Sequence, residues 1–270
     1  MMIDMHSHIL PGLDDGAADW EQAIAMARVA VEDGITEMTC TPHWVLGKYE
    51  NGRMSVLKRF VEFQERLAEE KIPLKIHSGA ELRIDMSILE RVKSGELLTL
   101  NDGSGYLLLE LPEEIIPANL SDFFWNLQLN GFRPILSHVE RNAVLRDNPE
   151  RLFRWVEAGI LAQITAASLI GEGLEEISDF SRMLVEHRMV HMLVTDTHSL
   201  RRRKPELSKA CRVIEEILGS EAAARMVCDT PQHVLRGEAV PVVDPIPLNE
   251  QRKKGGFWSF FGNRGSSLKI

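Results

Sequence analysis

Short apolar runs alternate with longer segments of helical periodicity along most of this chain, and this alternation constrains its fold more than any other feature. The runs end at residues that stand 27 to 38 positions apart, which suits one strand and one helix per unit. The seven expected strands are Ile3 to His8, Glu37 to His43, Leu74 to Glu81, Tyr106 to Leu111, Pro134 to His138, Leu161 to Thr165 and Met192 to Asp196.

The repetition continues without a break in composition, which favours one α/β domain over two. We expect its parallel strands to close into a seven-stranded (β/α)7 TIM-like barrel, with a doubly wound open sheet as the alternative. The first helix shows the local signals. Asp19 can cap it, Gln22 stands three residues further on, and Gly34 can end it in a left-handed turn.

Composition narrows the class of protein. Of the 270 residues, 44% are hydrophobic and 26% are charged, as in an ordinary globular protein. The net charge of −9 gives no general attraction to polyanions and argues against nucleic acid as a partner. The C-terminal end differs, since residues 251–270 carry five basic residues, four aromatics and no acid. We expect residues 246–270 to form a flexible tail that can contact an anionic membrane surface or a partner protein.

The cysteines bear on compartment and on mechanism. Cys40, Cys211 and Cys228 are odd in number and far apart, so the sequence predicts no disulfide framework. None of them begins a Cys-x5-Arg loop, which argues against a phosphatase that works through a cysteine thiolate. The start of the sequence lacks the pattern of a signal segment, and no apolar run reaches about 18 residues. We therefore expect a cytoplasmic protein.

Ionisable side chains stand at or near the carboxyl ends of six of the seven expected strands. In parallel α/β folds these ends converge on one face, so that residues distant in sequence become neighbours. Surface residues without a shared role would not recur at the same point of successive units. The residues gathered in this way are His6, His8, Asp15, His43, Glu81, Glu110, His138, Asp196 and His198.

These residue types indicate a metal site. Imidazoles and carboxylates together suit Mn²⁺, Fe²⁺ or Zn²⁺, whereas a thiolate site would need cysteine. Residues i and i+2 of a strand point to the same side, so His6 and His8 can share one ion. The ligands are too many for one ion, and we expect two or three. The other histidines are expected to be surface or packing residues: His77, His187, His191 and His233.

Six motifs hold these residues in a fixed order: MIDMHSHILPGLDDGA, TPHW, GAEL, LLLELP, PILSHVERN and VTDTHS. Together they resemble the polymerase and histidinol phosphatase (PHP) superfamily, and within it the capsule-operon protein-tyrosine phosphatases of bacteria. The resemblance implies a distorted seven-stranded barrel, a trinuclear metal centre usually assigned to manganese, and a PHP-type phosphatase domain over residues 1–245. The activity it implies is removal of phosphate from tyrosines in the tail of a membrane-associated bacterial kinase that controls capsular or exopolysaccharide synthesis.

The resemblance also implies three groups of metal ligands. They are His6, His8, Glu81 and Asp196 for one metal, Glu81, Glu110 and His138 for a second, and Asp15, His43 and His198 for a third. Asp14 is an alternative to Asp15, which is preferred because it precedes the turn glycine Gly16. This chain has Trp44 where the family often has a second histidine, and HVERN where it has HPERY. Neither change removes a ligand, but both can alter the rim of the pocket.

The implied metals would activate water for in-line attack on phosphorus and neutralise the phosphoryl oxygens, so no protein nucleophile is required. Arg141 is the candidate for a bidentate grip on phosphate, with a solvated loop arginine as the alternative. A leaving tyrosinate, whose parent pKa is ~10, needs little proton assistance. His43 or His198 is the candidate general acid. The basic residues 201–204 follow the last strand and can draw in an anionic peptide.

Other functions remain open. The same metal site could act on a small phosphomonoester such as histidinol phosphate, and kcat/KM for the two substrate classes would distinguish them. A nuclease is disfavoured by the acidic charge of the chain. A non-catalytic regulator that binds the kinase and holds structural metals belongs to a different class, although fewer ligands would suffice for such a site.

Overall fold

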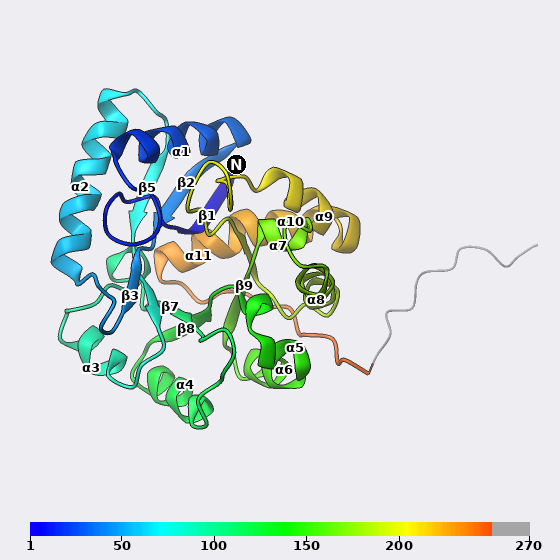
Figure 1. The fold of residues 1–270 in the computed structure, drawn as a ribbon. Coiled ribbons are helices and arrows are strands. Elements are labelled where there is room, and N and C mark those ends of the chain that lie inside the picture. Colours follow the sequence, from blue (N-terminus) through cyan, green and yellow to red (C-terminus); the bar gives the residue numbers. More distant parts are fainter. Residues whose placement is uncertain (250–270) are drawn as a thin grey trace, which may run out of the picture.

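Helices surround an assembly of mostly parallel strands in the computed structural model, which describes residues 1–249 (Figure 1). The strands are β1 (Met2–Ser7), β2 (Ile35–Cys40), β3 (His43–Val45), β4 (Tyr49–Glu50), β5 (Lys75–Ser78), β6 (Glu81–Arg83), β7 (Tyr106–Glu110), β8 (Arg133–Leu136), β9 (Leu161–Thr165) and β10 (Met192–Val194).

The chain enters a helical segment after almost every strand that it adds to a parallel sheet. The helices are α1 (Trp20–Asp33), α2 (Arg53–Glu69), α3 (Ile88–Lys93), α4 (Leu120–Leu129), α5 (Ala143–Asp147), α6 (Glu150–Glu157), α7 (Ala166–Leu169), α8 (Glu175–Glu186), α9 (Ser208–Leu218), α10 (Ser220–Ala224) and α11 (Thr230–Arg236). Three short turns complete the set: η1 (Leu100–Asp102), η2 (Val139–Arg141) and η3 (Arg225–Asp229). The expected single-domain α/β fold with parallel strands is confirmed.

The strands form two sheets, one in the order β1-β2-β5 and one in the order β10-β9-β8-β7-β6-β3-β4. Every pairing is parallel except that of β3 with β4. The end of β1 lies beside the segment that follows β10. There Ser7 and Thr197 form a parallel bridge, and the amide of Asp196 donates to the carbonyl of His6 over 3.0 Å.

Residues 1–249 contain ten shorter strands where the sequence predicts seven. Two expected strands are each interrupted, by Pro42 between β2 and β3 and by Gly79 between β5 and β6. Pro42 has no amide hydrogen to give to a ladder, and its carbonyl instead accepts from the amide of Glu81 over 3.1 Å. The short strand β4, which pairs with β3 in a hairpin, was not predicted. Both interruptions lie where the strands approach the predicted site.

Apolar side chains form two buried clusters. The larger joins residues of the strands to residues of the outer helices, and the smaller joins strand residues to residues of α11. The smaller cluster is built from Ile3, Met5, Leu100, Tyr106, Leu108, Ile135, Leu161, Met192, Val194, Val234 and Leu235. None of the nine predicted site residues belongs to this cluster, so the polar carboxyl ends stay outside its packing.

Local signals predicted the first helix well. The Asp19 side chain accepts a hydrogen bond from the amide of Gln22 over 2.9 Å, and the Gln22 side chain accepts from the amide of Ala18. Gly34 ends α1 with a φ of +96°. At the other end of the chain, the amide of Ile246 donates to the carbonyl of His187 over 2.8 Å. Most of the expected tail, residues 250–270, lies outside the described residues.

Across residues 1–249, the helices are all too short or too polar to cross a membrane.

Candidate metal centre

The carboxyl ends of the strands bring all nine predicted site residues into one cluster. His6 is in β1 and His8 follows it, while Glu81 begins β6 and Glu110 ends β7. Most of these side chains are buried. Asp15 is the exception, with 49% of its side chain exposed, because it lies on the loop between β1 and α1.

Four side-chain atoms form the tightest part of the cluster. The five distances among them that the structure gives as contacts lie between 3.1 and 3.4 Å. Donors that bind one ion at about 2.0–2.2 Å stand roughly 3.1–3.6 Å from one another, so this spacing suits one cation. The atoms are His6 Nε2, His8 Nε2, Glu81 Oε2 and Asp196 Oδ1.

Glu81 connects this group to a second one. Its Oε2 lies 2.9 Å from His43 Nδ1, and its Oε1 lies 2.9 Å from His138 Nε2. Glu110 stands further from the same two imidazoles, at 3.7 and 3.8 Å. Asp15 Oδ1 lies 3.5 Å from both His43 Nε2 and His198 Nε2, which forms a third group. His43 thus faces two groups through its two nitrogens, a feature absent from the grouping that the resemblance implied.

Hydrogen bonds on the far sides of the imidazoles orient their free nitrogens. Gln163 Oε1 lies 3.2 Å from His6 Nδ1, and Asp14 Oδ2 lies 2.7 Å from His8 Nδ1. Each pairing leaves Nε2 of its histidine pointing into the cluster, the arrangement in which an outer carboxylate or amide supports a metal-binding imidazole. Asp14 also accepts from the amide of His43 over 2.9 Å. The structure therefore gives Asp14 and Asp15 different surroundings, and only Asp15 faces the imidazoles of the third group.

Several buried atoms of the cluster have no hydrogen-bond partner among the described residues. They are His43 Nδ1, Glu81 Oε1, Glu81 Oε2, Asp196 Oδ1 and His198 Nε2. A buried polar atom without a partner is costly, and these are all atoms able to bind a cation. The donor set fits a group of divalent metal ions.

Neighbouring charges control ionisation within the cluster. Burial opposes ionisation of Glu81, but His6 and His138 outweigh it and hold the pKa of this carboxyl well below its ordinary value. Burial raises the pKa of Glu110, and the nearby charge of Glu81 raises it further. Burial also opposes a proton on His8, but Asp14 outweighs it and raises the pKa of His8 well above its ordinary value. Cations entering the cluster would replace that proton.

Three arginines hold the carboxylates from outside. Arg141 and Arg203 both donate to Asp196 Oδ2, over 2.5 and 2.9 Å, while Oδ1 faces His6 and His8. Arg83 makes a bidentate pair with Glu110 at 2.7 and 2.9 Å. The structure thus places Arg141, the predicted phosphate ligand, against the cluster rather than in a solvated loop. Sequence reasoning named Arg203 only among the basic residues 201–204 that can draw in an anionic peptide, not as a partner of Asp196. It did not single out Gln163, which lies inside a strand rather than at its end.

The loop after β1 folds closely over His8. The amide of Ala17 donates to the carbonyl of His8 over 3.0 Å, and a Cβ at position 16 would lie 2.0 Å from the same oxygen. Gly16 has no positive φ, so its role is to allow this close approach rather than to make a left-handed turn. Gly16 lies in a bend of the loop, where the sequence predicts a turn, and the close approach is a second reason for a glycine there.

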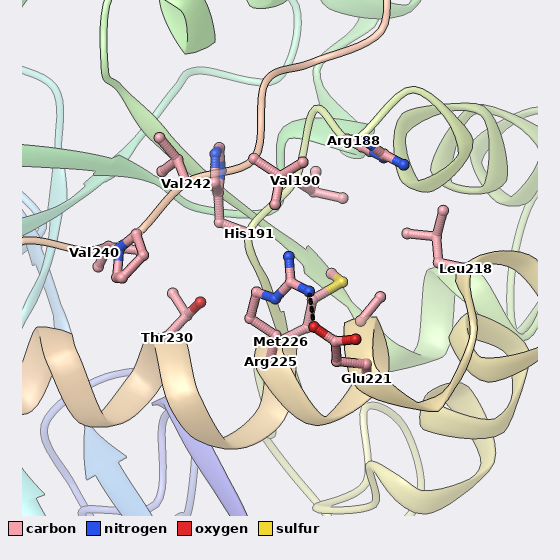
Figure 2. Close-up of a pocket in the computed structure, with 13 residues that line it drawn as sticks. Arg188, Val190, His191, Leu218, Glu221, Arg225, Met226, Thr230, Val240 and Val242 are labelled. Carbon is pink, nitrogen blue, oxygen red and sulfur yellow. Dashed lines mark hydrogen bonds and ion pairs between the residues drawn. The ribbon is translucent and has the colours of Figure 1, made fainter.

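Two cavities lie in different parts of the molecule. One of about 960 Å³ opens beside the cluster, where Asp15, His198 and Arg203 contribute to its wall. Another of about 270 Å³ lies near the amino end of β10, where the ion pair between Glu221 and Arg225 lines it together with His191 and Thr230 (Figure 2). None of the nine predicted site residues lines the second cavity.

The fold and this cluster define a class of α/β protein that gathers imidazoles and carboxylates at the carboxyl ends of its strands. Residues 2–236 match the model of a family described as capsular polysaccharide synthesis, CpsB/CapC. The chain belongs to this family.

Relatives agree with this assignment. The chain is 37% identical to the tyrosine-protein phosphatase YwqE of Bacillus subtilis over 95% of this chain and all of that protein. It is 34% identical to a putative tyrosine-protein phosphatase CapC of Staphylococcus aureus, over 75% and 79% of the two chains. A solved structure from a study of YwqE of B. subtilis and CpsB of Streptococcus pneumoniae, described as unique metal-dependent tyrosine phosphatases, superimposes with a TM-score of 0.87. It is 36% identical and covers 92% of this chain and all of the other.

Proposed function

We propose that this protein is a metal-dependent protein-tyrosine phosphatase. Its substrate would be phosphotyrosine in the tail of a membrane-associated bacterial tyrosine kinase that controls capsular or exopolysaccharide synthesis. The observation that supports this most strongly is the group of buried, unpartnered donor atoms around Glu81 at the carboxyl ends of the strands. Family membership supports the reaction class and its connection with capsule synthesis.

We assign the metal ligands to the three groups that the resemblance implies; the donor atoms also bring His8 beside the third group and His43 beside the second. His6, His8, Glu81 and Asp196 would hold one ion, Glu81, Glu110 and His138 a second, and Asp15, His43 and His198 a third. Mn²⁺ suits this mixture of nitrogen and oxygen donors without thiolate, and Fe²⁺ or Zn²⁺ can bind the same donors. When bound, such ions acidify water and neutralise the charge of phosphoryl oxygens.

The protein's own side chains would bind and orient the substrate. Arg141 and Arg203 meet at Asp196, so their guanidinium groups lie beside the cluster where a phosphoryl group would enter. A planar guanidinium can hold two phosphoryl oxygens at once. His198 Nδ1 is fixed on the carbonyl of Asp196 at 2.8 Å, which leaves Nε2 directed toward Asp15. We assign His198 or His43 as the group that could protonate the leaving tyrosinate.

We interpret the two sheets as one distorted seven-stranded barrel. Joining β2 to β3 and β5 to β6 restores seven strands, and the contact of Ser7 with Thr197 links the first to the last. Residues 1–245 would then form the phosphatase domain, and residues 246–270 a tail that contacts the membrane surface or a partner. Three free cysteines suit the reducing cytoplasm, where we place the reaction.

The test measures turnover of p-nitrophenyl phosphate and of a phosphotyrosine peptide by the full chain, before and after removal of metal and with Mn²⁺ restored. We expect activity only with metal, and loss of activity in His138→Ala. His233→Ala is the matched control, since His233 is on α11, outside the cluster, and bonds the carbonyl of Asp229, the residue that precedes this helix. Metal-independent turnover would contradict the proposal. A higher kcat/KM for histidinol phosphate than for the peptide would assign the site to a small phosphomonoester.

A further inference from the structure

The loop after Asp196 is ordered by its own hydrogen bonds. Ser199 Oγ accepts from the amides of Arg201 and Arg202, over 3.3 and 3.1 Å, and donates to the carbonyl of Arg202. The amide of His198 donates to the carbonyl of Arg203, which has a φ of +51°. These bonds fix the backbone that carries three consecutive arginines.

The three arginines of this loop have different surroundings. Arg203 is one-third exposed and its guanidinium is held by Asp196. Arg201 and Arg202 are exposed, and within residues 1–249 neither guanidinium takes part in an ion pair or side-chain hydrogen bond. The loop therefore turns one arginine toward the metal cluster and leaves two with their charge uncompensated.

Both free arginines line the cavity that opens beside the cluster. The same cavity, of about 960 Å³, is lined by Asp15 and His198, so a substrate that reaches the cluster passes these side chains. Glu172 lies on the wall too and is exposed. Asp15 faces the imidazoles of the cluster, which leaves Glu172 as the acid that opposes the two arginines.

We propose that Arg201 and Arg202 form a subsite for acidic side chains, so that the protein prefers phosphotyrosine peptides with a carboxylate beside the phosphotyrosine. This inference rests on the proposed phosphatase function. Because the loop is ordered in advance, little backbone freedom is lost when a peptide binds. Glu172 repels acidic side chains from its own wall and so favours their placement against the arginines.

The test compares two phosphotyrosine peptides, with glutamate or with glutamine on both sides of the phosphotyrosine. We expect the native, metal-loaded protein to show a kcat/KM about three- to tenfold higher for the acidic peptide, as for two exposed ion pairs. The ratio should fall as salt is raised, because salt screens exposed charges. In the double variant Arg201→Gln and Arg202→Gln the ratio should fall toward one, with p-nitrophenyl phosphate as the reference substrate.

Two further variants separate charge from loop structure. Arg201→Lys with Arg202→Lys keeps both charges and should retain the preference. Arg236→Gln is the matched control, since Arg236 is exposed on α11, and it should leave the ratio unchanged. Equal kcat/KM for the two peptides in the native protein would overturn the inference while leaving the phosphatase function intact.

A protein that hydrolyses no aryl phosphate would contradict the proposed function instead. The subsite is then tested by the fluorescence anisotropy of labelled forms of the two peptides. Tighter binding of the acidic peptide, lost in the double glutamine variant, would support the subsite, and equal binding would overturn it.

Discussion

At the carboxyl ends of the strands, ionisable side chains face one another with their donor atoms unpartnered, whereas at the amino ends apolar side chains pack beneath α11. Both regions are buried, so burial alone does not distinguish a functional cluster from a core. The difference lies in whether buried polar atoms find partners within the protein. At the amino end they do, as where the Tyr106 hydroxyl donates to the carbonyl of Glu238 over 2.7 Å.

Two histidines show the same contrast. His8, at the carboxyl end, has Asp14 beside it, and this carboxylate outweighs burial and raises the pKa of His8. His191, at the amino end, accepts a hydrogen bond from the amide of Ala162 over 3.1 Å, and burial lowers its pKa to about 4. The buried imidazole at the amino end is therefore neutral. The one at the carboxyl end favours its protonated form, and a cation could replace that proton.

The strongest test of the difference between the two regions is to remove the carboxylate of Glu81, which joins the proposed groups of metal ligands. Glu81→Gln should lower kcat/KM for p-nitrophenyl phosphate by roughly 10²- to 10³-fold, since Glu81 contacts four imidazoles. Bound metal, measured by elemental analysis, should fall with it. Glu238→Gln, an exposed change at the amino end, is the control and should retain both. Full activity in Glu81→Gln would contradict the assignment of this residue.

A substitution at the amino ends of the strands should lower the stability of the fold and leave metal binding intact. Met192 is fully buried in the smaller apolar cluster, so Met192→Ala should lower the free energy of unfolding by about 2–4 kcal/mol. Urea denaturation of the metal-free protein measures the loss, with the exposed Met54→Ala as control. Metal content at low temperature should stay normal. A loss of metal as large as that in Glu81→Gln would show that the two regions are not separate.

Asp14 provides a finer test of the metal site. It orients His8 without facing the third group of ligands, so Asp14→Asn should weaken metal binding by about 10- to 100-fold rather than abolish it. Titration with Mn²⁺ followed by recovery of activity measures the shift. An Asp14→Asn protein that binds no metal at any concentration would identify Asp14 as a direct ligand.

The smallest expected effect is a pH dependence at the amino end. The pKa of His191 is about 4 in the folded protein and about 6.5 when unfolded, so the unfolded chain takes up the proton first as pH falls. The stability associated with neutral His191 is therefore complete above pH 6.5 and is lost between about pH 6.5 and 4. The loss should be about 1 kcal/mol at pH 5.5 and should approach roughly 3 kcal/mol near pH 4. Unfolding of the metal-free protein at several pH values should show a steeper decline for the native chain than for His191→Asn, and parallel curves would contradict this.

The sequence predicted the position of the site better than its supporting contacts. His6, Glu110 and Asp196 could be grouped because parallel strands align their carboxyl ends, a property of the backbone alone. Gln163 and Asp14 orient the imidazoles through side-chain contacts across 157 and 6 positions. No local pattern marks such partners, because their role depends on which ring nitrogen faces them in the folded protein.

The strand count differed for a related reason. Residues 37–43 and 74–81 were each predicted as one continuous strand. Pro42 interrupts the first because it has no amide hydrogen for the ladder, and Gly79 interrupts the second where other segments of the chain approach it. A Cβ at Gly79 would lie 3.0 Å from the Leu100 side chain and 3.2 Å from that of Thr39. That crowding appears only when three distant segments are brought together. At Gly79, contacts among distant segments thus set an interruption of the strand that the pattern of the sequence could not predict.

The close passage of Gly16 over the His8 carbonyl has a practical meaning for protein engineering. A library of variants in residues 9–18, made to accept new phosphate esters, would vary the entrance to the cluster. Gly16 would keep this loop packed against His8, a proposed metal ligand. With any larger residue at this position the loop must lift, and His8 would shift with it. Such a library should hold Gly16 and the proposed ligand Asp15 constant and place its diversity at exposed positions such as Ala18, after testing each variant for metal retention.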